Sequence, residues 1–152
     1  MLFKKLFYTF INEKSYAIIL AFFMNKQIIL TAAFFGLLAV ILGAFGAHGL
    51  EGKISDKQLE TWGTANQYHF YHTLALLFLS TFSRAKSQSI KVSYIMFTLG
   101  IILFSGSIYL LSTRTLLGIE NISIIGPITP LGGLCFMVGW IALFIAAMKN
   151  RA

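Results

Sequence analysis

Charged side chains are scarce in this sequence: Asp, Glu, Lys and Arg make up 11% of the 152 residues, and only five residues are acidic. A soluble domain usually carries about 25% charged residues. Four stretches contain no charged residue at all: 27–50, 61–83, 92–113 and 121–148. A helix of about 20 apolar residues crosses the ~30 Å hydrocarbon layer of a bilayer. The missing charges therefore exclude a sizeable soluble domain and predict a membrane protein.

Cysteine is also nearly absent, and the one residue, Cys135, cannot form an intramolecular disulfide. It lies within the fourth uncharged stretch, where the expected role is that of a small packed hydrophobic side chain. The uncharged stretches hold no carboxylate, and no serine–histidine–acid set is evident along the chain. We therefore predict a protein that is not an enzyme, with no catalytic residue, no metal site and no cofactor.

The basic residues are distributed unevenly, although the net charge is +7. Lys and Arg number four before the first stretch, then two, three and one in the connections, and two in the tail. Short loops rich in Lys and Arg stay on the cytoplasmic side of a membrane. Both termini and the middle connection are therefore expected in the cytoplasm. No dense basic run is present, so the expected partner of these charges is the lipid headgroup layer and not nucleic acid.

The pattern predicts an all-α fold, a four-helix transmembrane bundle preceded by a short N-terminal interfacial helix. Residues 27–149 form the membrane domain, with spans at about 27–47, 61–83, 92–112 and 130–148. The segment 1–26 has apolar and basic residues at spacings that suit an amphipathic helix lying in the membrane surface. An alternative is that translation starts at Met24, since the chain from there already has a short basic lead before a span.

Small residues recur every three or four positions along the first span, and they predict close contact between helices. The strip consists of Ala32, Gly36, Ala39, Gly43 and Ala47, and the fourth span adds Gly132, Gly133 and Gly139. Lipid supplies no hydrophobic drive for helix association, so membrane helices rely on such residues to approach one another. A homo-oligomer or a complex with other membrane proteins is the expected form.

Two helix starts are marked in the connections. Ser55 followed by Gln58 fits a capping box, which predicts one helix from about 56 to 82. Trp62 is then expected near the outer interface, where its ring is favoured. Thr129 followed by Pro130 predicts an N-cap with proline at the first helical position, so the fourth span is expected to start there.

All three histidines lie near the predicted outer leaflet. His48 ends the first span, and His69 and His72 share one face of the second, with Tyr68 and Tyr71 beside them. Because a helical hairpin brings these positions together, the five side chains form a candidate polar cluster. Ionisable groups inside spans are costly and by default suggest function. Three roles stay open: joining helices through neutral imidazoles, binding a metal, haem or quinone headgroup, and sensing protons.

Four runs of sequence carry a resemblance: GAFGAHGL (43–50), YHFYHTLALL (68–77), FSGSIYLLS (104–112) and TPLGGLCFMVGW (129–140). They are similar to a family of small bacterial inner-membrane proteins known as domain of unknown function 423, which has a eukaryotic transmembrane-protein branch. The resemblance covers about 27–148 and implies a four-span, multi-pass protein of the bacterial cytoplasmic membrane. It implies no activity, and the residues before Met24 depart from the usual start of the family.

The sequence leaves three functions open. The preferred hypothesis is a non-enzymatic structural or accessory component that packs with partners in the membrane. The first alternative is binding of a small ligand, metal or haem through His48, His69 and His72. The second is an oligomeric transporter of small solutes. Transport ranks last because the spans contain no charged residue of the kind that usually marks an ion path.

Overall fold

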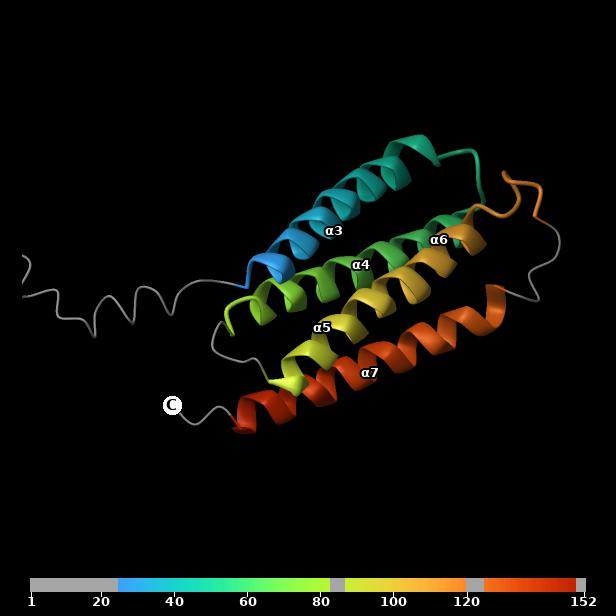
Figure 1. Ribbon diagram of the computed structural model, residues 1–152. Helices are drawn as coiled ribbons and strands as arrows, with labels where there is room; N and C mark the ends of the chain where they lie inside the picture. The colour runs from blue at the N-terminus through green and yellow to red at the C-terminus, as the bar shows by residue number, and fades with distance from the viewer. Residues whose placement is uncertain (1–24, 83–86, 120–124, 150–152) are drawn as a thin grey trace, which may run out of the picture.

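The computed structural model describes residues 25–82, 87–119 and 125–149, and the regular structure of these residues is helical. The elements are α3 (Lys26–Ala44), η1 (Phe45–Gly49), α4 (Asp56–Leu79), α5 (Gln88–Gly100), η2 (Ile101–Ser105), α6 (Gly106–Ser112) and α7 (Ile125–Lys149). The π-helical turns η1 and η2 continue their neighbours, so the described elements make four long rods (Figure 1). The prediction of an all-α, four-helix fold is confirmed. The predicted interfacial helix and the alternative start at Met24 lie outside the described residues.

The four rods lie side by side in a row (Figure 1). α3 packs on α4, α4 packs on the rod formed by α5, η2 and α6, and this rod packs on α7. α3 and α7 lie at the two edges of this view (Figure 1), but α3 also bonds α5 through the hydroxyls of Thr31 and Tyr94 at 2.9 Å, and α7 borders α4 along a groove. An edge helix has a wide surface that faces lipid, which accounts for the many exposed Leu, Ile, Phe and Met side chains of α3 and α7.

α3 and α4 form an antiparallel hairpin that is tied by hydrogen bonds toward both of its ends. At one end the Asn25 N–H donates to the Ser80 carbonyl over 2.8 Å. Toward the other end the Trp62 indole donates to the Leu42 carbonyl over 2.9 Å. α4 therefore extends along the whole length of α3.

Three rods are long and apolar enough to cross a membrane, and they comprise Lys26–Gly49, Gln88–Ser112 and Gly126–Lys149. α4 has a similar length of 24 residues, but its composition is more polar, and it is not among the helices that are apolar enough to cross a membrane. The difference comes from amide and imidazole side chains along the helix, including Asn66, Gln67, His69 and His72. Hydropathy alone therefore does not mark α4 as a membrane span, although α4 packs against helices that it does mark.

The last helix begins earlier than predicted. α7 starts at Ile125, so Pro130 lies inside the helix and not at its first position. The Thr129 hydroxyl bonds the hydroxyl of Ser107 over 2.7 Å, which joins α7 to α6. Proline at this place removes only the helix hydrogen bond to the carbonyl of Gly126, which is exposed near the helix end. The prediction that this helix begins at Pro130 is therefore wrong.

The start of α4 has the predicted capping box. The Gln58 N–H donates to Ser55 Oγ over 3.3 Å, and the Ser55 N–H donates to the Gln58 side chain over 3.0 Å. The helix ends at Leu79, slightly before the predicted end at 82. Trp62, which was expected in the lipid interface, is only 5% exposed, and its ring packs against the rings of Phe45 and Tyr109.

Candidate functional site

The three histidines occupy two different environments. His69 and His72 are buried in α4, whereas His48 is exposed in η1. Among the described residues, no group of three His, Cys, Asp or Glu side chains is arranged to hold a metal ion. The histidines therefore do not make the three-ligand site that their placement near one end of the hairpin suggested.

His72 uses both of its ring nitrogens. Nδ1 lies 2.8 Å from the carbonyl of Tyr68, which can only accept, so Nδ1 carries the proton. Nε2 then accepts a hydrogen bond from the Trp140 indole over 3.2 Å. The ring also stacks on Phe136, with centroids 3.4 Å apart and planes 8° from parallel. Both ring nitrogens of His72 are therefore engaged by groups of the chain itself.

His69 contacts side chains of α3 and α6. Its Nδ1 lies 3.4 Å from the Tyr109 hydroxyl, which donates to the Asn66 side chain over 3.0 Å. Its ring meets the Phe35 ring edge-on at 5.6 Å. His69 therefore joins α3, α4 and α6. Tyr109 and Asn66 were not among the predicted site residues. The only feature of the sequence that could have indicated them is that both are polar residues within uncharged stretches.

The contact between α4 and the rod of α5, η2 and α6 has a polar half and an apolar half. Buried polar side chains of α4 run from His69 to Thr73, which also lies beside Gly36 of α3, and the neighbouring rod buries Ser105 and Tyr109. The hydroxyls of Thr73 and Ser105 have no hydrogen-bond partner within the described part of the chain. The other half is filled by apolar side chains that are at most 2% exposed: Leu76, Leu79, Phe97 and Ile101. Large apolar side chains therefore dominate this half, although the hydroxyl of Ser93 on α5 is also buried and has no partner among the described residues.

Tyr68 and Tyr71 lie on the outer side of α4, away from the His69 contacts. Tyr68 is 38% exposed and packs on Phe104, while Tyr71 is 53% exposed. The Tyr71 hydroxyl accepts a hydrogen bond from the exposed side chain of Gln67 over 2.8 Å. Thr64, one turn before Gln67, is exposed on the same side. The outer face of α4 thus carries a polar stripe of Thr64, Gln67 and Tyr71, and sequence reasoning had not singled out Gln67.

An apolar groove of about 630 Å³ lies between α4 and α7. His72 and Trp140 form part of its wall, together with Tyr68, Phe104 and Met137. Its lining carries no charged side chain, and the imidazole of His72 is engaged by Trp140 as described. The groove thus has the chemistry of a surface that contacts lipid tails or another apolar helix.

The predicted small-residue strip of α3 faces α4 over most of its length. Ala32 and Ala39 are buried, at 2% and 0% exposure, and Gly36 and Gly43 are half-buried. A Cβ added to either glycine would touch a side chain of α4. Ala47, in η1, is exposed and lies outside this contact. Most of the strip is therefore used within the chain and not on its outer surface.

The three glycines of α7 differ in their surroundings. A Cβ on Gly132 would collide with the backbone of Phe104 in η2, and one on Gly139 would lie 2.6 Å from the Phe97 ring. A Cβ on Gly133 would find its nearest neighbour, the Phe104 ring, only at 3.9 Å. Gly132 and Gly139 therefore allow α7 to approach the α5–η2–α6 rod closely, and Gly133 borders the groove.

Comparison with known proteins identifies relatives that are membrane proteins. The family described as "Protein of unknown function (DUF423)" matches residues 42–133. The UPF0382 membrane protein YwdK of Bacillus subtilis (strain 168) is 50% identical over 128 residues, which are 82% of this chain and 98% of the relative. A UPF0382 membrane protein of Staphylococcus aureus (strain bovine RF122 / ET3-1) is 44% identical over 124 residues, or 82% and 97%. No solved structure matches the chain.

Proposed function

This chain belongs to the DUF423 family, whose relatives are named membrane proteins, and we propose that it is a non-enzymatic component that packs against partner helices within the bilayer. The observation that carries the proposal is the polar stripe on the outer face of α4, and above all the exposed amide of Gln67. The buried histidines support a structural role, because His69 and His72 contact side chains of neighbouring helices.

Gln67 lies midway along α4, where it is the twelfth of 24 residues. At 1.5 Å per residue the helix is about 36 Å long, which exceeds the ~30 Å hydrocarbon thickness. α4 also extends along the whole of α3, which has the length and composition of a span. We propose that α4 crosses the bilayer with its neighbours, which puts Gln67 near the midplane.

A primary amide in hydrocarbon requires hydrogen-bond partners. Gln67 donates one bond to Tyr71, whereas an amide has two donor hydrogens and an oxygen with two lone pairs. Lipid tails supply no partner for the remaining groups. Polar side chains that bond across membrane helices contribute about 0.6–2 kcal/mol each. A partner helix over this stripe would satisfy the amide and gain that free energy.

The middle portions of the other rods present apolar side chains outward, so the polar stripe distinguishes α4. The outward residues include Leu37, Val40 and Ile41 on α3, and Val138, Ile141 and Phe144 on α7. These apolar side chains need no hydrogen-bond partner, so lipid tails alone can cover them. The stripe on α4 therefore indicates which side of the row a partner would cover.

The proposal is tested by comparing Gln67→Leu with Gln27→Leu. Both changes replace an exposed amide by an apolar side chain, but Gln27 lies in the first turn of α3, at the end of the rod. Tagged full-length protein would be crosslinked in native membranes, extracted in mild detergent, and sized by native gel with mass spectrometry of its partners. We expect a complex larger than the monomer for the wild type and for Gln27→Leu.

Gln67→Leu should reduce the crosslinked fraction about tenfold, since one to two interhelical hydrogen bonds correspond to roughly that factor. A wild type that is strictly monomeric in native membranes would refute the proposal. Equal crosslinking of Gln67→Leu and wild type would show that association does not depend on this stripe.

We also propose that the protein lies in the bacterial cytoplasmic membrane with both termini in the cytoplasm. The support is the excess of Lys and Arg in the terminal segments and in the second connection. Cysteines placed at the two ends, in a Cys135→Ala background, should both resist a membrane-impermeant maleimide in intact cells. Labelling of either end in intact cells would reject this orientation.

A further inference from the structure

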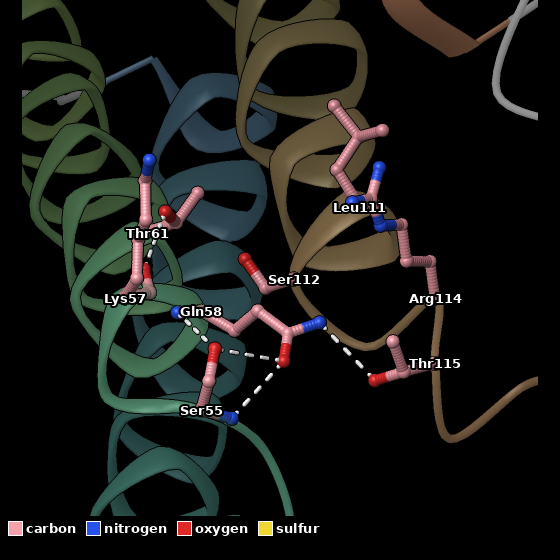
Figure 2. Close-up of a pocket in the computed structure, with 8 residues that line it drawn as sticks. All are labelled: Ser55, Lys57, Gln58, Thr61, Leu111, Ser112, Arg114 and Thr115. Carbon is pink, nitrogen blue, oxygen red and sulfur yellow. Dashed lines mark hydrogen bonds between the residues drawn. The ribbon is translucent and has the colours of Figure 1, made fainter.

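A pocket of about 540 Å³, lined mainly by polar residues, lies where α4 begins and α6 ends (Figure 2). Two cationic side chains line it, Lys57 from α4 and Arg114 from the turn after α6. Figure 2 places them on opposite sides of the pocket, with Gln58 and Ser112 between them. The hydroxyls of Thr61 and Thr115 complete the polar lining, which contains no carboxylate. Such a lining has the donors and the charge that an anion requires.

The two walls of the pocket are held together by Gln58. Its Oε1 accepts hydrogen bonds from the N–H and the hydroxyl of Ser55, at 3.0 and 3.1 Å. Its Nε2 donates across the pocket to the Thr115 hydroxyl over 3.1 Å (Figure 2). The capping side chain of α4 thus also anchors the turn after α6. The backbone segments that carry Lys57 and Arg114 are therefore joined before any ligand binds.

The pocket lies at the depth of lipid headgroups if the rods span the bilayer as proposed. α4 is about 36 Å long against a hydrocarbon layer of ~30 Å, so its first turn lies in the headgroup region. The chain segment that carries Arg114 also has three exposed leucines close in sequence: Leu110, Leu116 and Leu117. A cationic pocket beside exposed apolar side chains matches an amphiphile with an anionic head.

We propose that this pocket binds the phosphate group of an anionic lipid, with Lys57 and Arg114 on opposite sides of the phosphate oxygens. A guanidinium and an ammonium form strong charge-assisted hydrogen bonds to phosphate. The Thr115 hydroxyl, whose oxygen accepts from Gln58, keeps its own hydrogen free and provides a further donor, and the exposed leucines nearby contact the acyl chains. The site is separate from the stripe on α4 that carries the proposed assembly.

The test uses full-length protein in a maltoside detergent and three probes: short-chain phosphatidylglycerol, the matching diacylglycerol without phosphate, and inorganic phosphate. Binding would be measured by titration calorimetry and by native mass spectrometry. The variants are Lys57→Gln and Arg114→Gln, with Lys53→Gln as the control, because Lys53 is an exposed cation of the same connection that does not line the pocket. All three residues are exposed, so the fold should tolerate each change.

We expect phosphatidylglycerol to bind at least tenfold more tightly than either diacylglycerol or inorganic phosphate. Lys57→Gln and Arg114→Gln should each weaken that binding about tenfold, and Lys53→Gln should leave it unchanged. Inorganic phosphate that binds as tightly as the lipid, with the same dependence on Lys57 and Arg114, would overturn the lipid assignment in favour of a soluble phosphate. Absence of phosphatidylglycerol binding, or equal loss in Lys53→Gln, would overturn the site itself.

Discussion

The Trp140 indole donates a hydrogen bond to Nε2 of His72 across 3.2 Å, and this bond joins the last helix of the chain to the second rod. α7 otherwise packs mainly on the rod of α5, η2 and α6. The bond also determines the tautomer of His72, whose Nδ1–H donates to the Tyr68 carbonyl. Contacts with neighbouring helices thus account for the burial of His72 in α4.

Trp140→Phe should lower the stability of the folded protein by about 1 kcal/mol, because it removes the indole donor and retains an aromatic ring in the groove. The measurement is thermal or denaturant unfolding in detergent, followed by circular dichroism. A matched control is Phe144→Leu, which changes an outward aromatic residue of α7 that is 65% exposed. An unfolding midpoint of Trp140→Phe equal to that of the control would show that the bond contributes nothing.

Gly132→Ala should be strongly destabilising, whereas Gly133→Ala should be nearly neutral. The added Cβ meets the backbone of Phe104 in the first case and has its nearest neighbour at 3.9 Å in the second. Because backbone cannot move aside as a flexible side chain does, we expect a cost of about 1–3 kcal/mol for Gly132→Ala. Unfolding of the two variants under identical conditions is the measurement. Similar midpoints for both would mean that α7 does not approach η2 as closely as described.

Tyr109→Phe should destabilise the protein by about 1–2 kcal/mol, since it removes the hydroxyl that bonds Asn66 and contacts His69. The half-buried side chain of Asn66 would then lose its cross-helix donor. A double-mutant cycle with Asn66→Ala separates this bond from simple loss of packing. We expect the effects of the two substitutions to be non-additive by at least 0.5 kcal/mol. Strict additivity would indicate that the two side chains are not coupled.

Chelation should leave the stability of the wild type unchanged, because the described residues hold no three-ligand metal group and His48 is exposed. His48→Ala is likewise expected to have a midpoint within experimental error of the wild type. His69→Ala and His72→Ala should both lower it, since each removes a buried contact between helices. The measurement is unfolding with and without a chelator, with metal analysis of the same samples. A chelator effect that disappears in His48→Ala would restore a metal role for that residue.

Much of the local structure was predictable from the chain itself. Long stretches without charge marked the rods, and the pair Ser55 and Gln58 marked the start of α4. The start of α7 was not predictable, because Thr129–Pro130 is a common helix start and only the cross-helix bond of Thr129 to Ser107 shows its other use. A local sequence pattern indicates which helix starts a segment can adopt, and contacts with other helices determine which of them is adopted.

The residues of the candidate site were also predictable only in part. His69 and His72 were recognisable because an imidazole is unusual in a span, but their partners Tyr109 and Trp140 lie 40 and 68 positions further along the chain. The periodicity of a helix predicts that two residues share one face, but it does not predict which helix packs against that face. Gln67 was overlooked because its significance depends on its exposure, which the periodicity of α4 does not determine.

Sequence alone determined that this protein belongs in a membrane and is built of helices, because uncharged stretches of this length are stable only where lipid is the solvent and helices satisfy their own backbone. Only the tertiary structure decided the order of the rods, the partners of each histidine and the side of α4 that faces outward. These depend on which surfaces fit one another at close range, as Gly132 fits the backbone of Phe104, and such complementarity between distant segments is not encoded in any single stretch.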